Sequence, residues 1–486
     1  MERRAKIVAT LGPASSSARM ISRLLAAGVD VVRLNLSHGD HATHRAAIRA
    51  VRAAARDQGR FVPVLADLMG PRYRLGEVPG GTRTLRRGER VRLASAEHEA
   101  DLPVDDPALL AHLRRGERVL IDNGLVELEV EARRGSAVSA RVVTGGAVGT
   151  RKGINLPDTV LPFSISEKDR ADVAFAVAEG ADFLAASYVA APEDLHEIRE
   201  LASRHGARPP LVAKLERAAA IERLPEIVEA ADAVMVARGD LGVEVPLDQV
   251  PVLQKRIVAA GRATGTPVVV ATQMLESMIE RPRPTRAEAT DVANAVLEGA
   301  DALMLSGETA AGLYPVEAVK TMARIIERAE AYRREVPEAV RLPGAAAPGR
   351  TEAGRRGAAG DLRRAIADVV CAAAAQAADR LGVASIVAFS QGGFTARSIA
   401  RYRPAAPIRV FTTDEPVARQ VQLVWGVRPL LIERDVDHLD QVVEVVDRQL
   451  RRARLGRAGE SIVLLMGDPI RERPLTNLLR VHRLGS

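Results

Sequence analysis

The sequence contains a single cysteine, few aromatic residues and no long apolar segment. With Cys371 alone, the chain cannot form an intrachain disulfide, so a reducing compartment is expected. No apolar run approaches the roughly 20 residues that a membrane-spanning helix needs. The N-terminal run "KIVATLG" is too short for the apolar core of a signal peptide. These absences favour a cytoplasmic protein without a membrane segment.

Basic residues outnumber acidic ones, which gives a formal net charge of +7 and an isoelectric point near 9.9. Such a balance can indicate a nucleic-acid-binding protein. Here, however, arginines are scattered among aspartates and glutamates, aromatic residues make up only 3% of the chain, and no nucleic-acid-binding motif is found. The composition therefore argues against nucleic acid as a partner and suits an acidic small-molecule substrate.

The length and apolar content indicate a globular protein with more than one domain. A chain of 486 residues is too long for one ordinary core, and an apolar fraction of 47% is far too high for a disordered chain. Lysine is scarce, so each lysine is more informative than each arginine. The lysines are Lys6, Lys152, Lys168, Lys214, Lys255 and Lys320.

A short pattern recurs in the first two thirds of the chain. The segments "AAGVDVVRLN" (26–35), "AEGADFLAAS" (178–187) and "LEGADALMLS" (297–306) share a glycine, an aspartate and then an apolar run. This pattern predicts a helix that ends at a glycine cap, followed by a buried strand. The strand candidates are "KIVATLG", "VDVVRLN", "VPVLAD", "DFLAASYV", "LVAKLE", "AVMVARGD", "PVVVATQ" and "ALMLSGE". Alternation of eight such strands with helices predicts a (β/α)8 TIM barrel.

Two further regions interrupt or follow the predicted barrel. Between the third strand and the next helix lies a helix-poor, β-branched segment, which predicts a small inserted β lid domain. A segment rich in Gly, Ala, Pro and Arg follows the last barrel helix, and beyond it strands and helices alternate again as in a doubly wound α/β domain. The predicted division is barrel 1–70 and 156–340, lid 71–155, linker 341–361 and C-terminal α/β regulatory domain 362–486.

Polar residues follow the predicted barrel strands at their carboxyl ends. They are Arg33, Asn35, Ser37, His38, Asp67, Lys214, Glu216, Arg238, Asp240, Thr272, Gln273, Ser306 and Glu308. Polarity at strand ends is expected in any globular protein, because the chain must reach water. In a TIM barrel, however, these ends form the one face where active sites lie, and six strands contribute to it. This convergence favours a functional site.

The stretch "PPLVAKLERAAA" (209–220) places a cation and a carboxylate on the same side of a buried strand. Lys214 and Glu216 could form a local ion pair at the strand end. Alternatively, Glu216 and Asp240 are hard oxygen donors that suit Mg²⁺, while Lys214, Arg33 and Arg74 supply positive charge for phosphate. Carboxylate-bound Mg²⁺ surrounded by cations is typical of phosphoryl transfer. No Walker A or kinase-type glycine-rich loop is present.

The same segments resemble the pyruvate kinase family over essentially the whole chain. They include "KIVATLGPAS", "RLNLSHG", "RKGINLP", "VAKLE", "MVARGDLGVEVP", "ATQMLESM", "RPTRAEATDVANAVLEGADALMLSGETAAGLYP" and "VWGVRP". The resemblance implies a barrel with a β lid and a C-terminal α/β domain, assembled as a homotetramer. It implies transfer of the phosphoryl group of phosphoenolpyruvate to ADP, giving pyruvate and ATP in the last step of glycolysis.

The resemblance also implies roles for individual residues. Glu216 and Asp240 would hold Mg²⁺, for which Mn²⁺ is an alternative, and Lys214 would neutralise charge on the phosphoryl group. Substrate would be bound by Arg33, Lys214, the amide of Gly239, and Thr272. Thr272, with Ser306 and Glu308 behind it through water, would protonate the enolate carbon. The nucleotide would contact Asn35, His38, Arg74 and Lys152.

The segment after Asp67 departs from the common family pattern. Many members need K⁺, and their segment reads T-K-G-P-E-I-R-T-G where this chain has "LMGPRYRLG" (68–76). The K⁺ ligands of those members match Asn35, Ser37, Asp67 and the carbonyl of Leu68. A K⁺-independent branch carries a basic residue at the position of Arg72. We therefore expect the Arg72 guanidinium to replace the cation, so that K⁺ is not required; the alternative is that Arg72 points to solvent and K⁺ still binds.

A second departure lies in the C-terminal domain. Members activated by sugar phosphates usually carry a loop of the type T-x-S-G-R-[ST], whereas this chain reads "SQGGFTA" (390–396) with Gly392 and Phe394 at the Ser and Arg positions. Loss of a hydroxyl and a cation weakens phosphate capture. We expect no strong activation by fructose bisphosphate, which leaves another phosphorylated effector or none. Ala190 stands where an Arg is common, and it suggests no function.

Two other classes of function compete with this interpretation. One is a different barrel enzyme that uses phosphoenolpyruvate or pyruvate, such as a C–C lyase, but such enzymes give no reason for the lid and the C-terminal domain together. The other is a non-catalytic regulator that only binds ligands. Every matched catalytic position holds a competent residue, which favours an enzyme.

Overall fold

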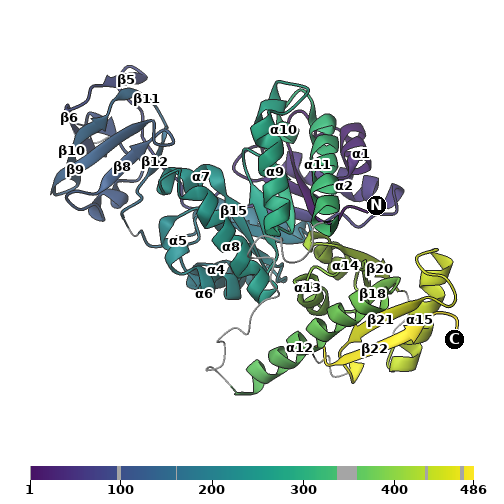
Figure 1. Ribbon diagram of the computed structural model, residues 1–486. Coiled ribbons are helices and arrows are strands. Elements are labelled where there is room, and N and C mark those ends of the chain that lie inside the picture. The colour runs from purple at the N-terminus through teal and green to yellow at the C-terminus, as the bar shows by residue number, and fades with distance from the viewer. Residues whose placement is uncertain (1, 96–99, 160, 336–357, 433–435, 471–474) are drawn as a thin grey trace.

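The computed structural model describes residues 2–95, 100–159, 161–335, 358–432, 436–470 and 475–486. Figure 1 shows three regions: a central barrel, a small β domain that projects from one side, and an α/β domain below. The predicted fold class, a TIM barrel with an inserted β lid and a C-terminal α/β domain, is confirmed. Among these residues, no helix is both long enough and apolar enough to cross a membrane.

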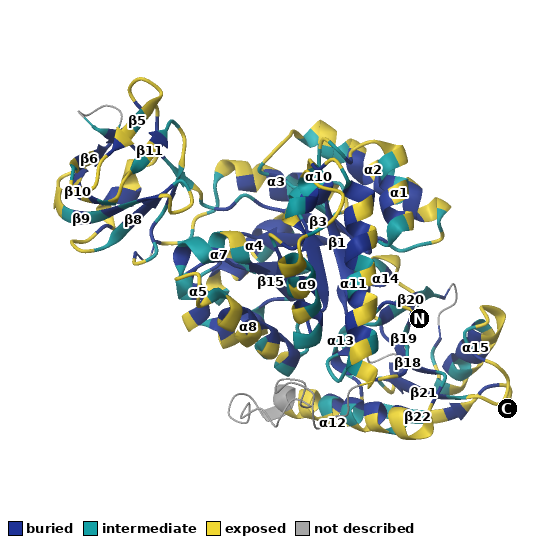
Figure 2. Cartoon of the chain, turned by 45° about the horizontal axis from the view of Figure 1, so that its top comes forward, coloured by how far each residue is buried: buried dark blue, intermediate teal, exposed yellow. Residues whose placement is uncertain are grey.

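The described strands of the barrel run parallel and close on themselves in the order β1-β17-β16-β15-β14-β13-β3-β2. Their bounds are Lys6–Leu11 (β1), Val31–Asn35 (β2), Val64–Asp67 (β3), Phe183–Ala186 (β13), Leu211–Leu215 (β14), Ala233–Ala237 (β15), Val268–Ala271 (β16) and Ala302–Leu305 (β17). Each of the strand candidates predicted from the sequence lies on one of them. Nearly all of their side chains are buried, as expected for strands covered on both faces (Figure 2).

Helices surround the barrel and connect its strands. Their bounds are Ala18–Ala27 (α1), His41–Asp57 (α2), Glu167–Ala178 (α3), Pro192–Arg204 (α4), Ala218–Glu222 (α5), Leu224–Ala230 (α6), Arg238–Glu244 (α7), Val250–Thr264 (α8), Arg286–Glu298 (α9), Gly307–Ala310 (α10) and Pro315–Glu335 (α11). A 3₁₀ turn, Glu276–Ile279 (η2), precedes α9. The glycines of the repeated pattern end three helices with positive φ, namely Gly28 at 119°, Gly180 at 66° and Gly299 at 105°. A side chain would be strained there, which is why the pattern keeps glycine.

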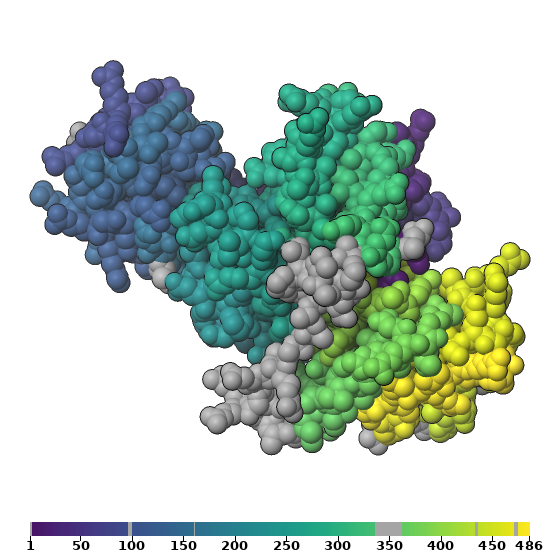
Figure 3. Space-filling view, in the orientation of Figure 1, coloured from purple at the N-terminus to yellow at the C-terminus, as the bar shows by residue number. Residues whose placement is uncertain are grey.

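The described part of the inserted lid contains two sheets, β4-β12-β8-β9-β10-β6-β7 and β11-β5, and a core of its own. Its strands are Tyr73–Arg74 (β4), Thr82–Leu85 (β5), Arg90–Ala94 (β6), Leu102–Pro103 (β7), Arg118–Ile121 (β8), Val126–Arg134 (β9), Ala137–Thr144 (β10), Gly146–Gly149 (β11) and Gly153–Asn155 (β12), with a 3₁₀ turn at Pro107–Ala111 (η1). The lid leaves the barrel after the carboxyl end of β3 and returns before α3, so it stands beside the carboxyl-end rim. Figure 3 shows a hollow between the lid and the barrel.

The C-terminal domain contains a described sheet of order β20-β19-β18-β21-β22. Its elements are Ala358–Leu381 (α12), Ser385–Phe389 (β18), Phe394–Ala400 (α13), Ile408–Thr412 (β19), Glu415–Gln420 (α14), Val421–Leu423 (η4), Val427–Leu431 (β20), Leu439–Arg452 (α15), Ser461–Met466 (β21) and Leu478–Arg483 (β22). The antiparallel edge strand β22 was not predicted from the sequence. Most of the predicted linker at 341–361 lies outside the described residues, but its last residues belong to α12 rather than to a linker.

The C-terminal domain packs against the amino ends of the barrel strands, at the end opposite to the rim. Lys6, at the start of β1, donates to the carbonyl oxygen of Val427 at 2.7 Å. Arg403 pairs with Asp301, just before β17, at 3.0 Å. The barrel therefore separates two surfaces: a rim shared with the lid and a base covered by the C-terminal domain.

Candidate active site

The centre of the rim is a buried carboxylate held by two cations, one from β2 and one from β14. Asp67, at the end of β3, is 1% exposed; its Oδ2 accepts a hydrogen bond from Arg33 Nε at 2.6 Å, and its Oδ1 lies 3.3 Å from Lys214 Nζ. Arg33 also donates from Nη1 to Thr10 Oγ1 at 3.1 Å. Residues from β1, β2, β3 and β14 thus meet at one point.

Lys214 joins this group to Glu216. The distance from Lys214 Nζ to Glu216 Oε1 is 2.8 Å, and Lys214 also donates to Ser187 Oγ at 2.7 Å. Glu216 Oε2 accepts the backbone N–H of Tyr188 at 2.7 Å. The two side chains do converge, as their spacing in the strand predicted, and in this structure they form the ion pair that was the simpler interpretation.

Burial and charge act against each other on these groups. Burial raises the pKa of Glu216, and Asp240 raises it further; Lys214 and the Tyr188 amide only partly offset this, leaving a pKa of about 7. Burial alone would raise the pKa of Asp67, but Lys214 and Arg33 outweigh it and lower that pKa. Burial also disfavours charge on Lys214, yet Asp67 and Glu216 raise its pKa. Lys214 and Asp67 are therefore charged, while Glu216 takes up a proton near neutral pH.

The end of β16 is shaped by strained backbone. Thr272 and Gln273 have φ of 67° and 56°, values that are rare for residues other than glycine and that concentrate at functional sites. The Gly239 amide donates to Thr272 Oγ1 at 2.8 Å. Arg238 braces this turn, since its Nη2 donates to the Thr272 carbonyl at 2.6 Å and its Nη1 pairs with Asp291 at 2.7 Å. Gly239 and Thr272, both predicted to bind substrate, thus lie together, whereas Arg238 supports the backbone.

Glu308 and Ser306 follow β17. Glu308 is 2% exposed, and its carboxylate accepts the backbone N–H groups of Ser306 at 2.7 Å and Leu275 at 3.0 Å. Burial raises the pKa of Glu308, with these amides opposing it. The buried Ser306 hydroxyl has no hydrogen-bond partner among the described residues. Glu308 therefore orients the two turns, and the Ser306 hydroxyl remains free for water or ligand.

The carboxylates at the rim fit a divalent cation that substrate helps to bind. Among the described residues, no group of three or more His, Cys, Asp or Glu side chains could hold a metal by itself. Glu216 Oε1 is buried against the Lys214 ammonium, and the nearby charge of Asp240 raises the Glu216 pKa. A cation shared by the two carboxylates would relieve this repulsion. Mg²⁺ commonly binds through one or two carboxylates, with water and substrate oxygens completing the shell.

The residues predicted to contact nucleotide lie where the lid meets the barrel. Arg74, on β4, donates from Nη1 to the Arg151 carbonyl at 3.0 Å. Lys152, at the lid hinge, pairs with Asp122 at 2.8 Å. His38 is exposed beyond β2. Arg74 and Lys152 thus pair within the lid, and the His38 side chain faces solvent.

Three of the four groups that match the K⁺ ligands of other family members have partners here, namely Asp67, the Leu68 carbonyl and Asn35. Both oxygens of Asp67 face cations, and the Leu68 carbonyl accepts the Ser187 hydroxyl at 2.7 Å. Asn35 Oδ1 accepts the Ser37 amide at 3.2 Å. Arg72 is exposed and forms no ion pair with any described residue, although its charge acts on the nearby Tyr188 hydroxyl.

Sequence reasoning missed Thr10 and Ser187. Both lie at the carboxyl ends of barrel strands, in β1 and directly after β13, where the strand-end rule would have found them. They were overlooked because a single hydroxyl after an apolar run is a weak signal beside a Lys or an Asp. With them, each described barrel strand supplies a polar group to the rim.

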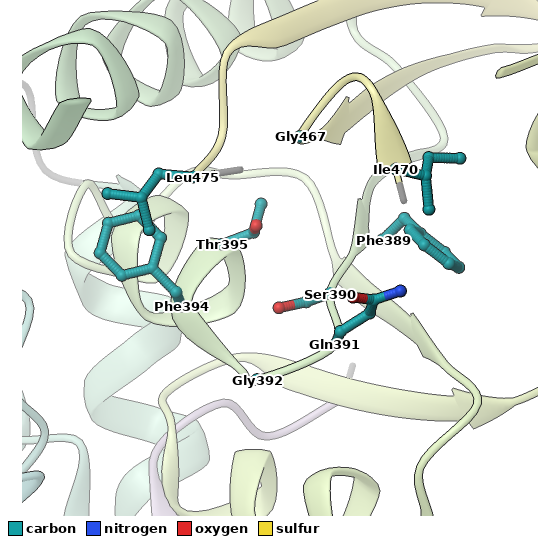
Figure 4. Close-up of a pocket in the computed structure, with 9 residues that line it drawn as sticks. All are labelled: Phe389, Ser390, Gln391, Gly392, Phe394, Thr395, Gly467, Ile470 and Leu475. Atoms are coloured by element: carbon teal, nitrogen blue, oxygen red, sulfur yellow. The ribbon is translucent and has the colours of Figure 1, made fainter. Parts of the chain in front are cut away.

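A separate pocket of about 260 Å³ lies in the C-terminal domain. It is lined by Phe389, Ser390, Gln391, Gly392, Phe394, Thr395, Gly467, Ile470 and Leu475. In Figure 4 the hydroxyl groups of Ser390 and Thr395 lie between the rings of Phe394 and Phe389. None of these described lining residues is a cation. The loop 390–396, compared above with sugar-phosphate loops, therefore borders a real pocket.

The fold and the rim together define a class: TIM-barrel enzymes that act on an anionic substrate at the carboxyl ends of their strands. Comparison with known proteins specifies the family. The profile described as "Pyruvate kinase, barrel domain" matches residues 2–319, and "Pyruvate kinase, alpha/beta domain" matches residues 368–482.

Individual relatives agree with these profiles. The chain is 43% identical to a pyruvate kinase of Mycobacterium tuberculosis strain CDC 1551, over 100% of this chain and 99% of the relative. It is 40% identical to one from Geobacillus stearothermophilus, over 99% of this chain and 80% of the relative. The crystal structure of a pyruvate kinase from Cryptosporidium parvum superposes with a TM-score of 0.86 at 30% identity, covering 99% and 96% of the two chains. The chain belongs to the pyruvate kinase family.

Proposed function

We propose that the chain transfers the phosphoryl group of phosphoenolpyruvate to ADP, giving pyruvate and ATP, the last step of glycolysis. The observation that carries this proposal is the position of Lys214, between Asp67 and Glu216 at the carboxyl ends of the barrel strands. A fixed cation at this place lies beside the carboxylates that would share a metal with the substrate. Phosphoryl transfer depends mainly on such positioning and charge neutralisation.

Each rim residue has a task in this reaction. Glu216 and Asp240 would hold Mg²⁺, which supplies charge neutralisation at the oxygens of the phosphoryl group and of enolpyruvate. Lys214 neutralises charge on the phosphoryl group as its bond to the enol oxygen breaks and its bond to an ADP oxygen forms. Arg33, held by Asp67 and Thr10, binds substrate. The Gly239 amide, which donates to Thr272 Oγ1, would donate to the substrate instead.

The enolate left by phosphoryl loss needs a proton on carbon. Thr272 delivers it through water connected to Ser306 and Glu308. This role is supported by the Ser306 hydroxyl, which has no partner among the described residues, and by the Glu308 carboxyl, whose pKa burial raises above its ordinary value. A group with a raised pKa is a better proton reservoir than an ordinary glutamate.

The nucleotide would lie between the rim and the lid. Asn35, His38, Arg74 and Lys152 are proposed to contact it. Arg74 and Lys152 are bonded within the lid, so ADP would compete with the Arg151 carbonyl and with Asp122. This competition predicts that the two side chains exchange these partners for the nucleotide when ADP binds.

Arg72 is proposed to make K⁺ unnecessary, and the proposed metal is Mg²⁺, with Mn²⁺ as the alternative. The charge of Arg72 acts on the Tyr188 hydroxyl, which belongs to the rim, and the Asp67 carboxylate already faces two cations. In buffer free of K⁺ and ammonium, we expect full activity. Stimulation by K⁺ well beyond that of Na⁺ at equal ionic strength would contradict this role. The variant Arg72→Glu should acquire a K⁺ requirement.

A homotetramer is proposed from the family and from unpartnered apolar surfaces. Leu362, Ile366 and Val369 are 62%, 40% and 67% exposed and lie on one face of α12. Leu247 and Val252 are also exposed, at the start of α8. Light scattering after size exclusion tests this state.

For the C-terminal pocket, the absence of a cation among its described lining residues supports weak or no activation by fructose bisphosphate, and leaves another phosphorylated effector or none.

The deciding experiment is formation of pyruvate from phosphoenolpyruvate and ADP with Mg²⁺, followed by coupled reduction of pyruvate. We expect turnover that depends on both substrates and on the metal. Binding of phosphoenolpyruvate without any turnover, across a range of phosphorylated effectors, would favour the non-catalytic regulator instead.

A further inference from the structure

Tyr188 occupies an unusual position beside the proposed metal ligands. It follows Ser187 at the carboxyl end of β13 and has a φ of 58°, a value that is rarely adopted by a bulky residue. Its backbone N–H donates to Glu216 Oε2 at 2.7 Å. Strained backbone of this kind persists only where the surrounding structure holds it, and it often serves to aim a side chain at a site.

The ring of Tyr188 is fixed by close packing on Gly70. A Cβ at Gly70 would lie 3.2 Å from Tyr188 Cδ2 and 2.9 Å from Ser187 Cβ, and Gly70 itself has a φ of 71°. Glycine is therefore required there for two reasons, one of which is to leave room for the ring. The ring lies between the segment after β3 and the end of β13, with little freedom to move.

The Tyr188 hydroxyl has no hydrogen-bond partner in the described parts of the chain, although tyrosine hydroxyls in such partly buried surroundings usually find one. The charges of Glu216, Asp240, Arg72 and Lys214 all act on it. It is therefore a rigid, unused hydrogen-bond donor at the place where the anionic substrate is expected.

We propose that Tyr188 is a further substrate-binding residue, whose hydroxyl donates a hydrogen bond to a negatively charged oxygen of phosphoenolpyruvate. This inference rests on the proposed function. Through its amide, the same residue positions Glu216, so one strained turn would orient both a metal ligand and the substrate.

The variant Tyr188→Phe removes the hydroxyl and keeps the ring, and Tyr332→Phe, at an exposed tyrosine on α11, is its matched control. The dissociation constant of phosphoenolpyruvate with Mg²⁺ and without ADP is measured by calorimetry, together with kcat, KM and the melting temperature. A hydrogen bond to a charged group predicts a weakening of about tenfold or more in phosphoenolpyruvate binding and in KM for Tyr188→Phe. ADP binding, kcat to within a few fold, the melting temperature and the control variant should be unchanged.

Equal phosphoenolpyruvate affinity in wild type and Tyr188→Phe, both folded, would overturn the role of Tyr188. A change in kcat alone would also overturn it, because the hydroxyl would then act in the chemical step rather than in binding. Wild-type protein that binds phosphoenolpyruvate without turnover would overturn the proposed function, yet the affinity comparison would still decide for or against Tyr188. Wild-type protein that does not bind phosphoenolpyruvate would overturn both.

Discussion

Buried charges gather at both ends of the barrel, yet the two clusters are organised differently. At the base, Asp30 accepts the Ile7 amide at 2.9 Å and pairs with Arg3 at 2.7 Å, while Lys6 donates to the Val427 carbonyl. At the rim, Asp67 and Glu216 surround Lys214. Both clusters contain a buried lysine and a buried carboxylate, so composition alone does not distinguish them.

The partners of each cluster reveal the difference. At the base, Lys6 bonds to the Val427 carbonyl and to the Gln422 side chain of the C-terminal domain, and the nearby Glu330 carboxylate accepts the backbone amides of Arg4 and Ala5. Such partners are part of the fold and cannot be released. At the rim, the partners of Lys214 are side chains, and they sit beside strained turns at Tyr188 and Thr272. A buried ion pair indicates a ligand site when a ligand can take over its partners.

The largest expected effect is on the metal. Glu216→Gln or Asp240→Asn removes one of the proposed carboxylate ligands, and we expect kcat/KM to fall by about 10³-fold or more, since a metal contributes several kcal/mol to such reactions. The Mg²⁺ concentration for half-maximal rate should rise as well. At the base, Glu330→Gln serves as the control and should leave Mg²⁺ dependence unchanged; a normal Mg²⁺ response in Glu216→Gln would refute the ligand assignment.

A smaller effect separates the clusters by pH. With burial and Asp240 placing the pKa of Glu216 at about 7 in the free protein, protons compete with Mg²⁺ below that pH. Mg²⁺ affinity should fall by up to about tenfold per pH unit below pH 7 and level off above it. Calorimetric titration of Mg²⁺ at several pH values between about 5.5 and about 8.5 checks this pH dependence of the affinity. A flat profile would show that Glu216 stays ionised without metal.

The smallest expected effect concerns stability at the base. Burial lowers the pKa of Lys6 to about 7, with Asp30 and Glu2 opposing this and Arg428 and Arg3 adding to it. In the unfolded chain the lysine would titrate near its ordinary value of 10.5. Between these values the unfolded chain binds more protons, so stability should rise with pH from about 7 toward about 10.

Lys6→Met tests this stability effect, because it removes the titrating group and should flatten the rise. Denaturant unfolding of wild type and Lys6→Met at several pH values gives the two slopes directly. Parallel slopes would show that Lys6 does not titrate in this range and that its ammonium stays charged in the fold.

Much of this arrangement could be predicted from the sequence. The barrel strands are apolar runs after a repeated Gly–Asp corner, and the cations and carboxylates at their carboxyl ends follow from the parallel topology. The edge strand β22 escaped because "LLRVHR" (478–483) mixes Leu, Val and basic residues without the apolar run of the other strands. Tyr188 escaped because its importance lies in a positive φ, which is not visible in a single sequence. Thr10 was overlooked because a lone hydroxyl at the end of an apolar run is a weak signal beside a Lys or an Asp.

The most direct test makes the same substitution at both ends of the barrel. In Lys214→Met we expect phosphoryl transfer from phosphoenolpyruvate to ADP to fall by about 10²–10³-fold or more, because the cation beside the transferred group is lost. In Lys6→Met, kcat with saturating substrates should stay within about threefold of wild type, since that lysine holds a domain contact rather than substrate. Near-normal turnover in folded Lys214→Met, or an equal loss in Lys6→Met, would contradict the assignment of catalysis to the rim.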